Sequence, residues 1–318
     1  MMHLYHSNSM EALRQELLAL LEQPLQDPFA AEIILVQNQG MARWLTLAIA
    51  SQQGVAANIE FPLPARFIWR LFELQLQHVP DSSAFDREAL LWRAMALLPD
   101  VAGRRGCEEI AGYLQGADAA LKSYQLSCRI ADLFDQYLVY RPELIEAWEM
   151  GSEQHWQAQL WRAMRAQSAE PHRAELIREL HRSLASDGAA AGLPQRVALF
   201  GISALPPHYL ETLAVVAQHL EVHLFLLNPS LNYWGDIVSG KDQARLRQSW
   251  RRLGRSGHPE FYAEGNPLLA SLGKQGRDFL EQLHEYESVE SDFFADPGEQ
   301  TLLQCLQGDI LMLQSRGC

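Results

Sequence analysis

Residues 33–69, IILVQNQGMARWLTLAIASQQGVAANIEFPLPARFIW, contain the pattern that decides the fold. The apolar run Ile33–Val36 has no polar alternation, which is typical of a strand covered on both faces in a parallel sheet. A polar turn at Gln37–Gly40 follows, and apolar residues then recur at helical spacing from Met41 to Ala48. Strand, polar turn and helix in this order predict an α/β protein with a parallel sheet.

The flanking sequence extends this pattern into two βαβ units. A first strand, an N-cap at Ser7–Ser9 and the amphipathic run Met10–Leu21 precede the Ile33 strand. A second unit follows much later, with a helix over 206–219 between its two strands. The predicted strands are His3–His6, Glu32–Val36, Ala56–Phe61, Arg196–Phe200 and Glu221–Leu227.

Between the two units, from about Ala65 to Ser186, strand signals are absent and helix patterns follow one another. The predicted helices there are Asp86–Leu98, Asp118–Tyr140, Trp156–Ala166 and Arg173–Leu184. A helical block inside an α/β frame predicts an inserted domain over 79–189, within a core formed by 1–78 and 190–318. Two further helices, over 267–287 and 298–313, close the chain, and we expect the acidic segment 288–298 between them to be a mobile loop.

The turn at Gln37–Gly40 lies where nucleotide-binding α/β proteins seat a phosphate at a helix N-terminus. The loop G-x-x-x-x-G-K-[ST] needs glycines for close backbone approach, a lysine for the phosphates and a hydroxyl for magnesium. This turn has one glycine, with Arg43-Trp44 in place of the last two residues, and Gly235–Lys241 is followed by Asp242 instead of a hydroxyl. The sequence therefore predicts an NTPase-like scaffold without the groups that bind triphosphate.

Composition excludes several classes of protein. The 318 residues include 26 basic and 39 acidic ones, a net charge of −13, which argues against a protein that coats duplex DNA by bulk electrostatics. No apolar run is long enough for a membrane span, and the N-terminus lacks the pattern of a signal peptide, so we expect a cytoplasmic protein. The four cysteines show no C-x-x-C spacing, and we expect reduced thiols and no metal site.

Six collinear segments together resemble the N-terminal part of the RecC family, the gamma subunits of exodeoxyribonuclease V, which is the RecBCD helicase-nuclease. The segments are QNQGMARWL (37–45), AANIEFPLPARFIWRLF (56–72), ADLFDQYLVYRP (131–142), GISALPPHYL (201–210), NYWGDI (232–237) and NPLLASLGKQGRDF (266–279). The resemblance implies a superfamily 1 helicase-like 1A core with an inactive phosphate loop and a helical 1B domain as the insertion. It also implies a non-catalytic subunit that binds no cofactor, with ATP and Mg²⁺ used by RecB-like and RecD-like partners.

Residue chemistry by itself gives a first set of candidates for DNA binding. Gln37, Gln39 and Arg43 carry the donor and acceptor geometry that base edges recognise. Leu63 and Trp69 suit contact with an unpaired base, although aromatic residues at helix starts are more often core residues. On the predicted helix over 118–140, Asp132 and Asp135 share one face, where the simplest interpretation is a solvated surface whose carboxylates pair with nearby arginines.

The resemblance implies a functional role for these positions, because the matching RecC residues line the tunnel that takes the 3′-ended single strand and reads the regulatory sequence Chi. Carried over by position, the DNA- and Chi-binding residues are Gln37, Gln39, Arg43, Leu63, Trp69, Asp132, Leu133, Asp135, Arg141 and Arg173. The family turn has a small hydroxyl residue where Gln39 stands and a glutamine where Arg43 stands. Since Arg prefers guanine edges and Gln prefers adenine, we expect either a different recognised sequence or weaker recognition.

Further candidates and alternatives stay open. His172, beside Arg173, is a candidate DNA contact, and the arginines over 245–255 are candidates for duplex phosphates or for an acidic partner surface. Under the main hypothesis the chain contacts single-stranded and forked duplex DNA. The alternatives are a free-standing enzyme with an atypical phosphate site, at Gln37–Arg43 or Gly235–Lys241, and a scaffold that binds only proteins.

Overall fold

The computed structural model describes residues 1–77, 79–80, 83–186, 192–237 and 265–314. The chain divides into two compact units, the first formed by Met1–Ile68, Gly192–Leu205 and Tyr209–Cys318, and the second by Trp69–Ala191 with Pro206–His208. The first division thus falls after Ile68, within a helix, where the sequence predicted it after residue 78. In the parts of the chain that the structure describes, no helix is both long and apolar enough to cross a membrane.

The first unit is built on a six-stranded sheet in which every strand pairs parallel to its neighbours. The strand order is β3-β2-β4-β5-β1-β6. This confirms the predicted α/β class, and all five predicted strands are present. The strands are β1 (Met2–Ser7), β2 (Glu32–Leu35), β3 (Ile59–Glu60), β4 (Arg196–Phe200), β5 (Glu221–Leu227) and β6 (Val289–Asp292).

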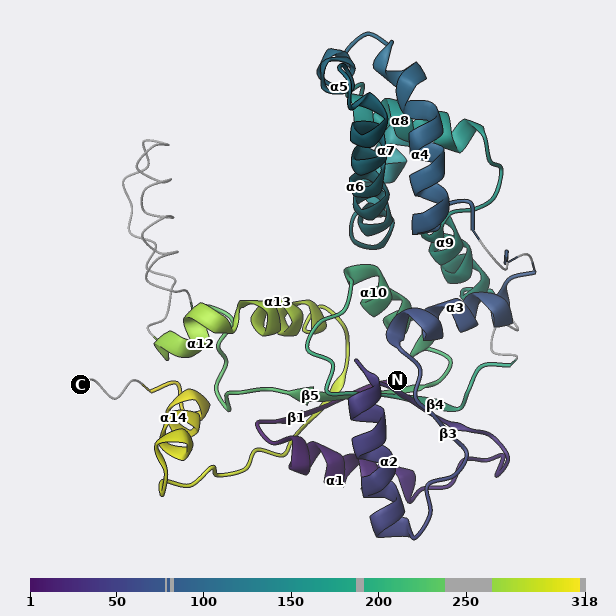
Figure 1. Cartoon of the computed structure of the whole chain (residues 1–318). Coiled ribbons are helices and arrows are strands. Elements are labelled where there is room, and N and C mark those ends of the chain that lie inside the picture. Colours follow the sequence, from purple (N-terminus) through teal and green to yellow (C-terminus); the bar gives the residue numbers. More distant parts are fainter. Residues whose placement is uncertain (78, 81–82, 187–191, 238–264, 315–318) are drawn as a thin grey trace. The chain divides into compact units, whose positions relative to one another are not determined.

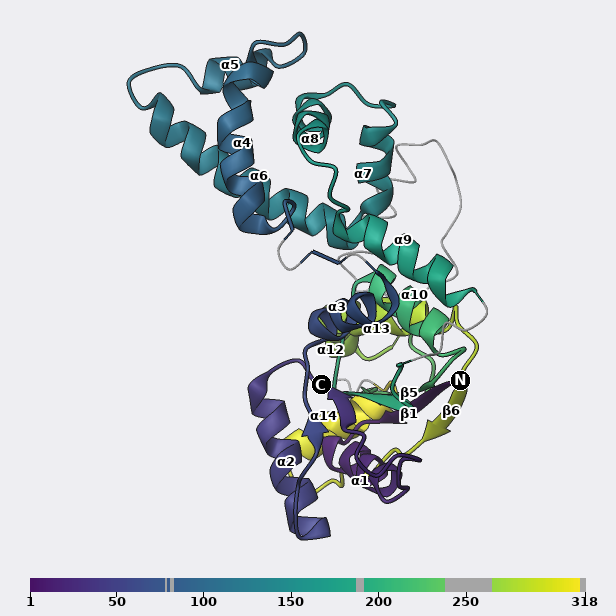
Figure 2. The ribbon, with the colours of Figure 1, turned by 90° about the vertical axis from the view of Figure 1, so that its right-hand side faces the viewer.

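Helices cover both faces of this sheet (Figures 1 and 2). On one face lie α1 (Met10–Leu21) and α2 (Gln39–Gln53), and on the other lie α10 (Pro207–Val216) and α13 (Lys274–Leu283). The connections from β1 to β2 and β3 run toward one edge of the sheet, whereas those from β4 to β5 and β6 run toward the other, so right-handed crossovers put the helices on opposite faces. The connections that leave two neighbouring strands run in opposite directions at two places in the sheet, between β2 and β4 and between β5 and β1. Ligands bind at such switch points in open α/β sheets.

Two predictions for the C-terminal region were wrong. Segment 288–298 contains the edge strand β6, which pairs only with β1 and carries the polar sequence Val-Glu-Ser-Asp, so it lacks the apolar pattern of a central strand. The single helix predicted over 267–287 is two helices, α12 (Pro267–Leu272) and α13, separated at Gly273. A Cβ at Gly273 would lie 2.5 Å from the Leu269 carbonyl oxygen and 2.9 Å from the Trp234 ring, so only glycine fits there. The last helix is α14 (Leu302–Leu311).

The second unit is helical and has its own core. Trp148 and Trp161 are fully buried and meet Phe134 edge-on, with ring centroids 5.7 and 5.5 Å from that of Phe134. Such aromatic pairs stabilise a core beyond the area they bury. Two short helices, α5 (Glu108–Tyr113) and α7 (Pro142–Glu149), were not predicted, because six and eight residues are too few to show a helical period. The helices are α4 (Arg87–Ala102), α5 (Glu108–Tyr113), α6 (Ala119–Tyr140), α7 (Pro142–Glu149), α8 (Trp156–Ala166) and α9 (Arg173–Leu184), and α3 (Pro64–Gln75) crosses the boundary between the units.

The buried side chain of His223 predicts that the stability of the α/β unit depends on pH. This β5 side chain is 4% exposed, stacks on His3 at 4.8 Å, and accepts or donates one hydrogen bond with the Tyr5 hydroxyl at 3.0 Å. Burial, together with the nearby His3, lowers the pKa of His223 to about 4, against the opposing effect of Glu221. The unfolded chain therefore binds a proton near the ordinary value while the folded chain does not, and stability falls as the pH falls from about 6.5 to about 4.

We expect His223→Gln to flatten the pH dependence of the free energy of unfolding in that window. The wild-type loss attributable to this residue is at most about 3–4 kcal/mol, since its pKa is lowered from 6.5 to about 4 and one pKa unit corresponds to about 1.4 kcal/mol. Urea unfolding at a series of pH values measures it, with His155→Gln as the control because His155 is a solvent-exposed cap residue of α8. Parallel pH profiles for wild type and His223→Gln would contradict the assignment.

Candidate nucleic-acid interface

The polar turn after β2 lies at the carboxyl edge of the sheet, at the β2/β4 switch point. Asn38 caps α2 by accepting a hydrogen bond from the Met41 backbone nitrogen at 3.0 Å. A Cβ at Gly40 would stand 3.0 Å from that same side-chain oxygen, so the glycine leaves room for the cap. Gln37 donates from Nε2 to Ser203 Oγ, 3.2 Å away on the segment after β4. The turn is thereby held against the neighbouring strand's end.

The predicted residues of the first unit present their side chains to solvent around this turn. Gln37, Gln39 and Arg43 are all exposed, and Leu63 is 46% exposed. Leu63 is close to the turn because the Val36 nitrogen donates to the Pro62 carbonyl oxygen at 3.2 Å. Two amides, a guanidinium and an apolar side chain thus share one edge, a combination that suits base edges and an unstacked base.

The predicted residues of the second unit centre on α6. Asp132 is paired with Arg87 of α4, and Asp135 Oδ1 lies 3.8 Å from Nη1 of Arg173, the first residue of α9. These carboxylates therefore pair with nearby arginines, as the simplest interpretation of the sequence predicted. Leu133 lies between them and is half-buried. The structure brings Asp132, Leu133, Asp135 and Arg173 together, and adds Arg87, which the sequence did not single out because it lies 45 residues from Asp132.

The two other residues of this unit have different contacts. Arg141 ends α6 and begins α7, is well exposed, and lies 3.8 Å from the Glu143 carboxylate. Trp69 of α3 is half-buried, with its ring edge-on to Phe72 at 5.7 Å. None of the ten predicted side chains is buried, although Gln37, Asp132, Asp135 and Arg173 already have partners within the chain. Their assigned roles remain predictions.

His172 is the exception among the candidates, since its side chain is fully buried and cannot contact DNA directly. It caps α9, with Nδ1 accepting from the Glu175 nitrogen at 3.4 Å while Glu175 accepts in return from the His172 nitrogen at 3.0 Å. Because Nδ1 is an acceptor, Nε2 carries the proton and donates to Glu149 Oε1 at 3.2 Å. His172 therefore fixes the start of α9, from which Arg173 projects toward Asp135.

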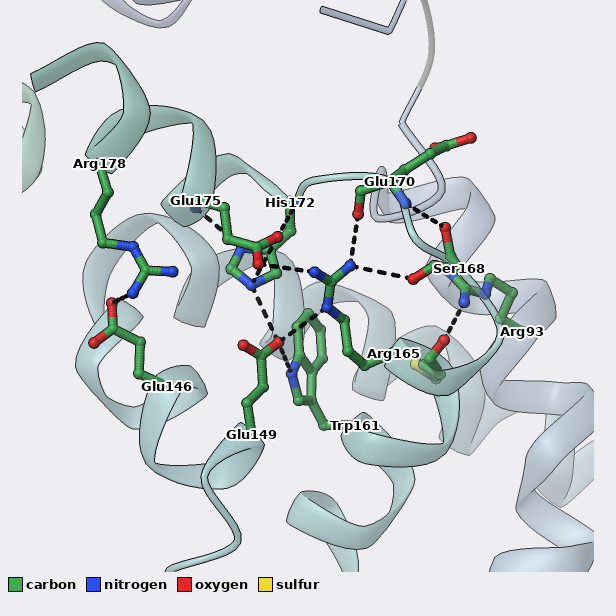
Figure 3. Close-up of polar contacts among 11 residues, drawn as sticks. Arg93, Glu146, Glu149, Trp161, Arg165, Ser168, Glu170, His172, Glu175 and Arg178 are labelled. Atoms are coloured by element: carbon green, nitrogen blue, oxygen red, sulfur yellow. Dashed lines mark hydrogen bonds and ion pairs between the residues drawn. The ribbon is translucent and has the colours of Figure 1, made fainter. Parts of the chain in front are cut away.

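Figure 3 shows the ion-pair network around this histidine, which joins α7, α8 and α9. Arg165 lies 2.8 Å from Glu175 and 3.6 Å from Glu149, and Trp161 Nε1 donates to Glu149 at 3.0 Å. Burial raises the pKa of the Glu149 carboxyl, but His172, Trp161 and Arg165 outweigh that effect and the net pKa is lowered. The carboxylate is thus held in its charged form.

Glu149, His172 and Glu175 also form a group whose ligand atoms lie within 4.8 Å of one another, close enough to consider a metal ion. The guanidinium of Arg165 pairs with both carboxylates, and the two imidazole nitrogens are engaged with Glu149 and the Glu175 backbone. The positive charge that a cation would bring is already supplied. We therefore interpret the cluster as a structural network.

Two sequence candidates lie wholly or partly outside the described residues. The arginines over 245–255 fall within 238–264, and Gly235–Lys241 is described only as far as Ile237.

A parallel sheet with helices on both faces, joined to a separate helical unit, defines an α/β protein. The chain belongs to the RecC family, since the family described as RecC, N-terminal domain, matches residues 2–313. It is 40% identical to the RecBCD enzyme subunit RecC of Escherichia coli (strain K12), over 99% of this chain and 31% of that protein. The RecC subunits of Haemophilus influenzae and Mycolicibacterium smegmatis are 34% and 31% identical, over 98% and 97% of this chain and 33% and 28% of their own lengths. The chain therefore spans about a third of the length of these relatives.

The network in Figure 3 predicts unequal effects for two arginines. Arg165→Met leaves two partly buried carboxylates without their cation, and we expect a loss of about 2–3 kcal/mol in the free energy of unfolding. Arg178→Met removes a more exposed pair, Arg178 with Glu146, and should cost less than about 1 kcal/mol. Urea unfolding measures both losses. Equal losses would show that the network around Arg165 contributes no more to the free energy of unfolding than the more exposed Arg178 pair does.

Proposed function

We propose that this chain forms a non-catalytic, DNA-binding part of a RecBCD-type helicase-nuclease that acts in recombinational repair of double-strand breaks in the cytoplasm. In this proposal it guides the 3′-ended single strand, contacts forked duplex DNA and recognises Chi. The observation that carries the proposal is the exposed edge formed by Gln37, Gln39, Arg43 and Leu63 at a switch point of the sheet. The names of the relatives, RecBCD enzyme subunit RecC, support the assembly with RecB-like and RecD-like partners.

The α/β unit is proposed to be a helicase-like 1A core, and the helical unit an inserted 1B domain. The helical unit follows β3 and precedes β4, so the chain leaves the sheet and returns to it at the neighbouring position beside β2. An insertion between two strands of one sheet is what that assignment requires.

The proposal that this core is inactive is supported by the turn between β1 and α1, at the β5/β1 switch point. Asn8 Nδ2 donates to the Ala295 carbonyl oxygen and the Ala295 nitrogen donates to Asn8 Oδ1, both at 2.8 Å. Ser7 Oγ donates to the Phe293 carbonyl oxygen at 2.7 Å. The side chains of Ser7 and Asn8 are thus bonded to the chain segment after β6, which leaves these two side chains unavailable to a phosphate.

The turn at the other switch point, between β2 and β4, is also poorly suited to bind a nucleotide phosphate. The Gln37–Gly40 turn carries no lysine, and its capping oxygen and the Gln37 amide are engaged with Met41 and Ser203. We therefore assign ATP and Mg²⁺ to the partner subunits and no cofactor to this chain.

Substituting the predicted tunnel residues should separate Chi response from unwinding. In the full-length subunit assembled with its partners, we expect Trp69→Ala and Asp135→Asn to leave the unwinding rate within about twofold and to reduce Chi-dependent changes in cleavage at least about tenfold, since each lost base contact is worth about 1–3 kcal/mol. Trp92→Ala and Asp100→Asn, both exposed residues of α4 outside the predicted set, are matched controls. A normal Chi response in both test variants would count against the assigned tunnel.

The inactive core predicts that nucleotide does not stabilise the chain. A ligand at a hundred times its dissociation constant adds about 2.7 kcal/mol to stability, which thermal unfolding with and without ATP and Mg²⁺ resolves easily. We expect no shift in Tm and no DNA-stimulated ATP hydrolysis by the purified chain. A shift that Arg43→Ala abolishes would instead favour a nucleotide-binding enzyme using the Gln37–Arg43 turn.

A further inference from the structure

A cavity of about 180 Å³ lies within the α/β unit at the carboxyl ends of β1, β5 and β6. Its wall includes His6 of β1, Asn228 directly after β5, and Asp292 at the end of β6, with residues of α13 on another side. This is the β5/β1 switch point, where open α/β sheets commonly bind ligands. The candidate DNA-binding residues take no part in it.

Two segments of the chain, 232–237 and 266–279, build this cavity. Neither of them has a role in the proposed DNA site. Trp234, from Asn232–Ile237, is buried, and its Nε1 donates to Asn228 Oδ1 at 3.0 Å. Gly273 and Gly276, from the segment 266–279, approach the indole so closely that a Cβ would stand 2.9 and 3.6 Å from it. Arg277, from the same segment, donates to the Ile237 carbonyl oxygen. The cavity is therefore held by a packed indole and by hydrogen bonds.

The wall of the cavity is negatively charged. Among the described residues, three carboxylates line it, those of Glu281, Glu290 and Asp292, together with the Arg277 guanidinium and the His284 ring. Arg277 donates to the neutral Ile237 carbonyl and keeps its charge, but the three carboxylates outnumber it. A ligand with positive charge is favoured here, and a phosphate or polynucleotide is repelled.

His6 supplies an unsatisfied polar group in the same wall. It is 5% exposed, and among the described residues neither ring nitrogen has a hydrogen-bond partner, the Glu290 carboxylate being 3.9 Å from Nε2. Burial lowers the pKa of His6, so the ring is neutral and keeps one acceptor nitrogen. A buried polar atom without a partner is rare in a folded protein and points to a ligand that donates a hydrogen bond.

The lining of the cavity also includes an exposed aromatic ring. Tyr233 is 63% exposed, lines the cavity, and curls over Gly235, where a Cβ would stand 2.1 Å from the tyrosine oxygen. An exposed tyrosine beside carboxylates is the environment that binds a guanidinium, by its charge and through the face of the ring. The volume admits one side chain.

We infer that this cavity binds an arginine side chain presented by another polypeptide. The arginine would donate to Glu290, Asp292 and His6 and stack against Tyr233. This gives the α/β unit a protein-docking pocket that is separate from the proposed DNA-binding edge, and it does not rest on the DNA-binding proposal.

The test is the binding of a triarginine peptide to the full 318-residue chain by titration calorimetry, with tricitrulline as the uncharged peptide of the same shape. We expect triarginine to bind and tricitrulline to bind at least about tenfold more weakly, since hydrogen bonds to charged groups contribute about 1.5–3 kcal/mol each. Glu290→Gln with Asp292→Asn should weaken triarginine at least about tenfold. Because both carboxylates are exposed, the double variant should keep its fold, which circular dichroism checks.

The matched control is Glu285→Gln with Glu287→Gln, two exposed carboxylates near the end of α13 that do not line the cavity. This variant should bind triarginine like the wild type, and His6→Phe should bind it several-fold more weakly. Equal affinity for the two peptides, or equal loss in both double variants, would each overturn the inference. If the chain binds triarginine through these carboxylates but a separate titration shows no binding of a dT oligomer, the result would count only against the DNA proposal.

Discussion

The α/β unit depends on the pairing of β2 with β4 across the long helical insertion. Glu32 and Arg196, at the amino ends of these strands, form a two-pronged ion pair in which the guanidinium is 4% exposed and also donates to the Gln23 carbonyl oxygen at 2.7 Å. A forked arginine–carboxylate pair fixes both distance and orientation, so it sets the register Ile34 to Ala198 and Leu35 to Leu199. At the other end of the same strands, that register places Gln37 against Ser203.

Closing a sheet across some 160 residues carries an entropic cost that grows only slowly with the length of the insertion. The cost is smaller still when the insertion folds by itself, and the helical unit has a core of its own around Trp148, Trp161 and Phe134. The carboxyl edge of the sheet then has two switch points with different surroundings. At β2/β4 the side chains of the turn face solvent, whereas at β5/β1 the turn is bonded to residues 293–295 and the neighbouring cavity is acidic. A single sheet can therefore present two surfaces of different chemistry, one suited to bases and one to a basic side chain.

A buried histidine and three partly buried charged residues organise the helical unit in the same way. His172, Glu149, Glu175 and Arg165 satisfy one another's hydrogen bonds, so the start of α9 and the guanidinium of Arg173 have a defined position. Most of the proposed DNA-contacting residues of this unit extend from elements that this network or the Trp148 cluster fixes. Side chains that bind a ligand gain affinity when their backbone is already held in place.

Sequence by itself determined the class of the fold, because uninterrupted apolar strands and helical periods are local signals, as at Ile33–Val36 and Arg173–Leu184. It also predicted, through the family resemblance, a set of ten side chains that the structure leaves accessible, although their roles await experiment. Only the tertiary structure decided that the polar segment Val289–Asp292 is a strand, that His172 is buried, that Arg87 meets Asp132, and that His6, Asp292 and Trp234 share a cavity. The physical reason is that strand pairing at an edge, burial of a polar group and convergence of charges are set by residues far apart in the chain, and no local pattern records them.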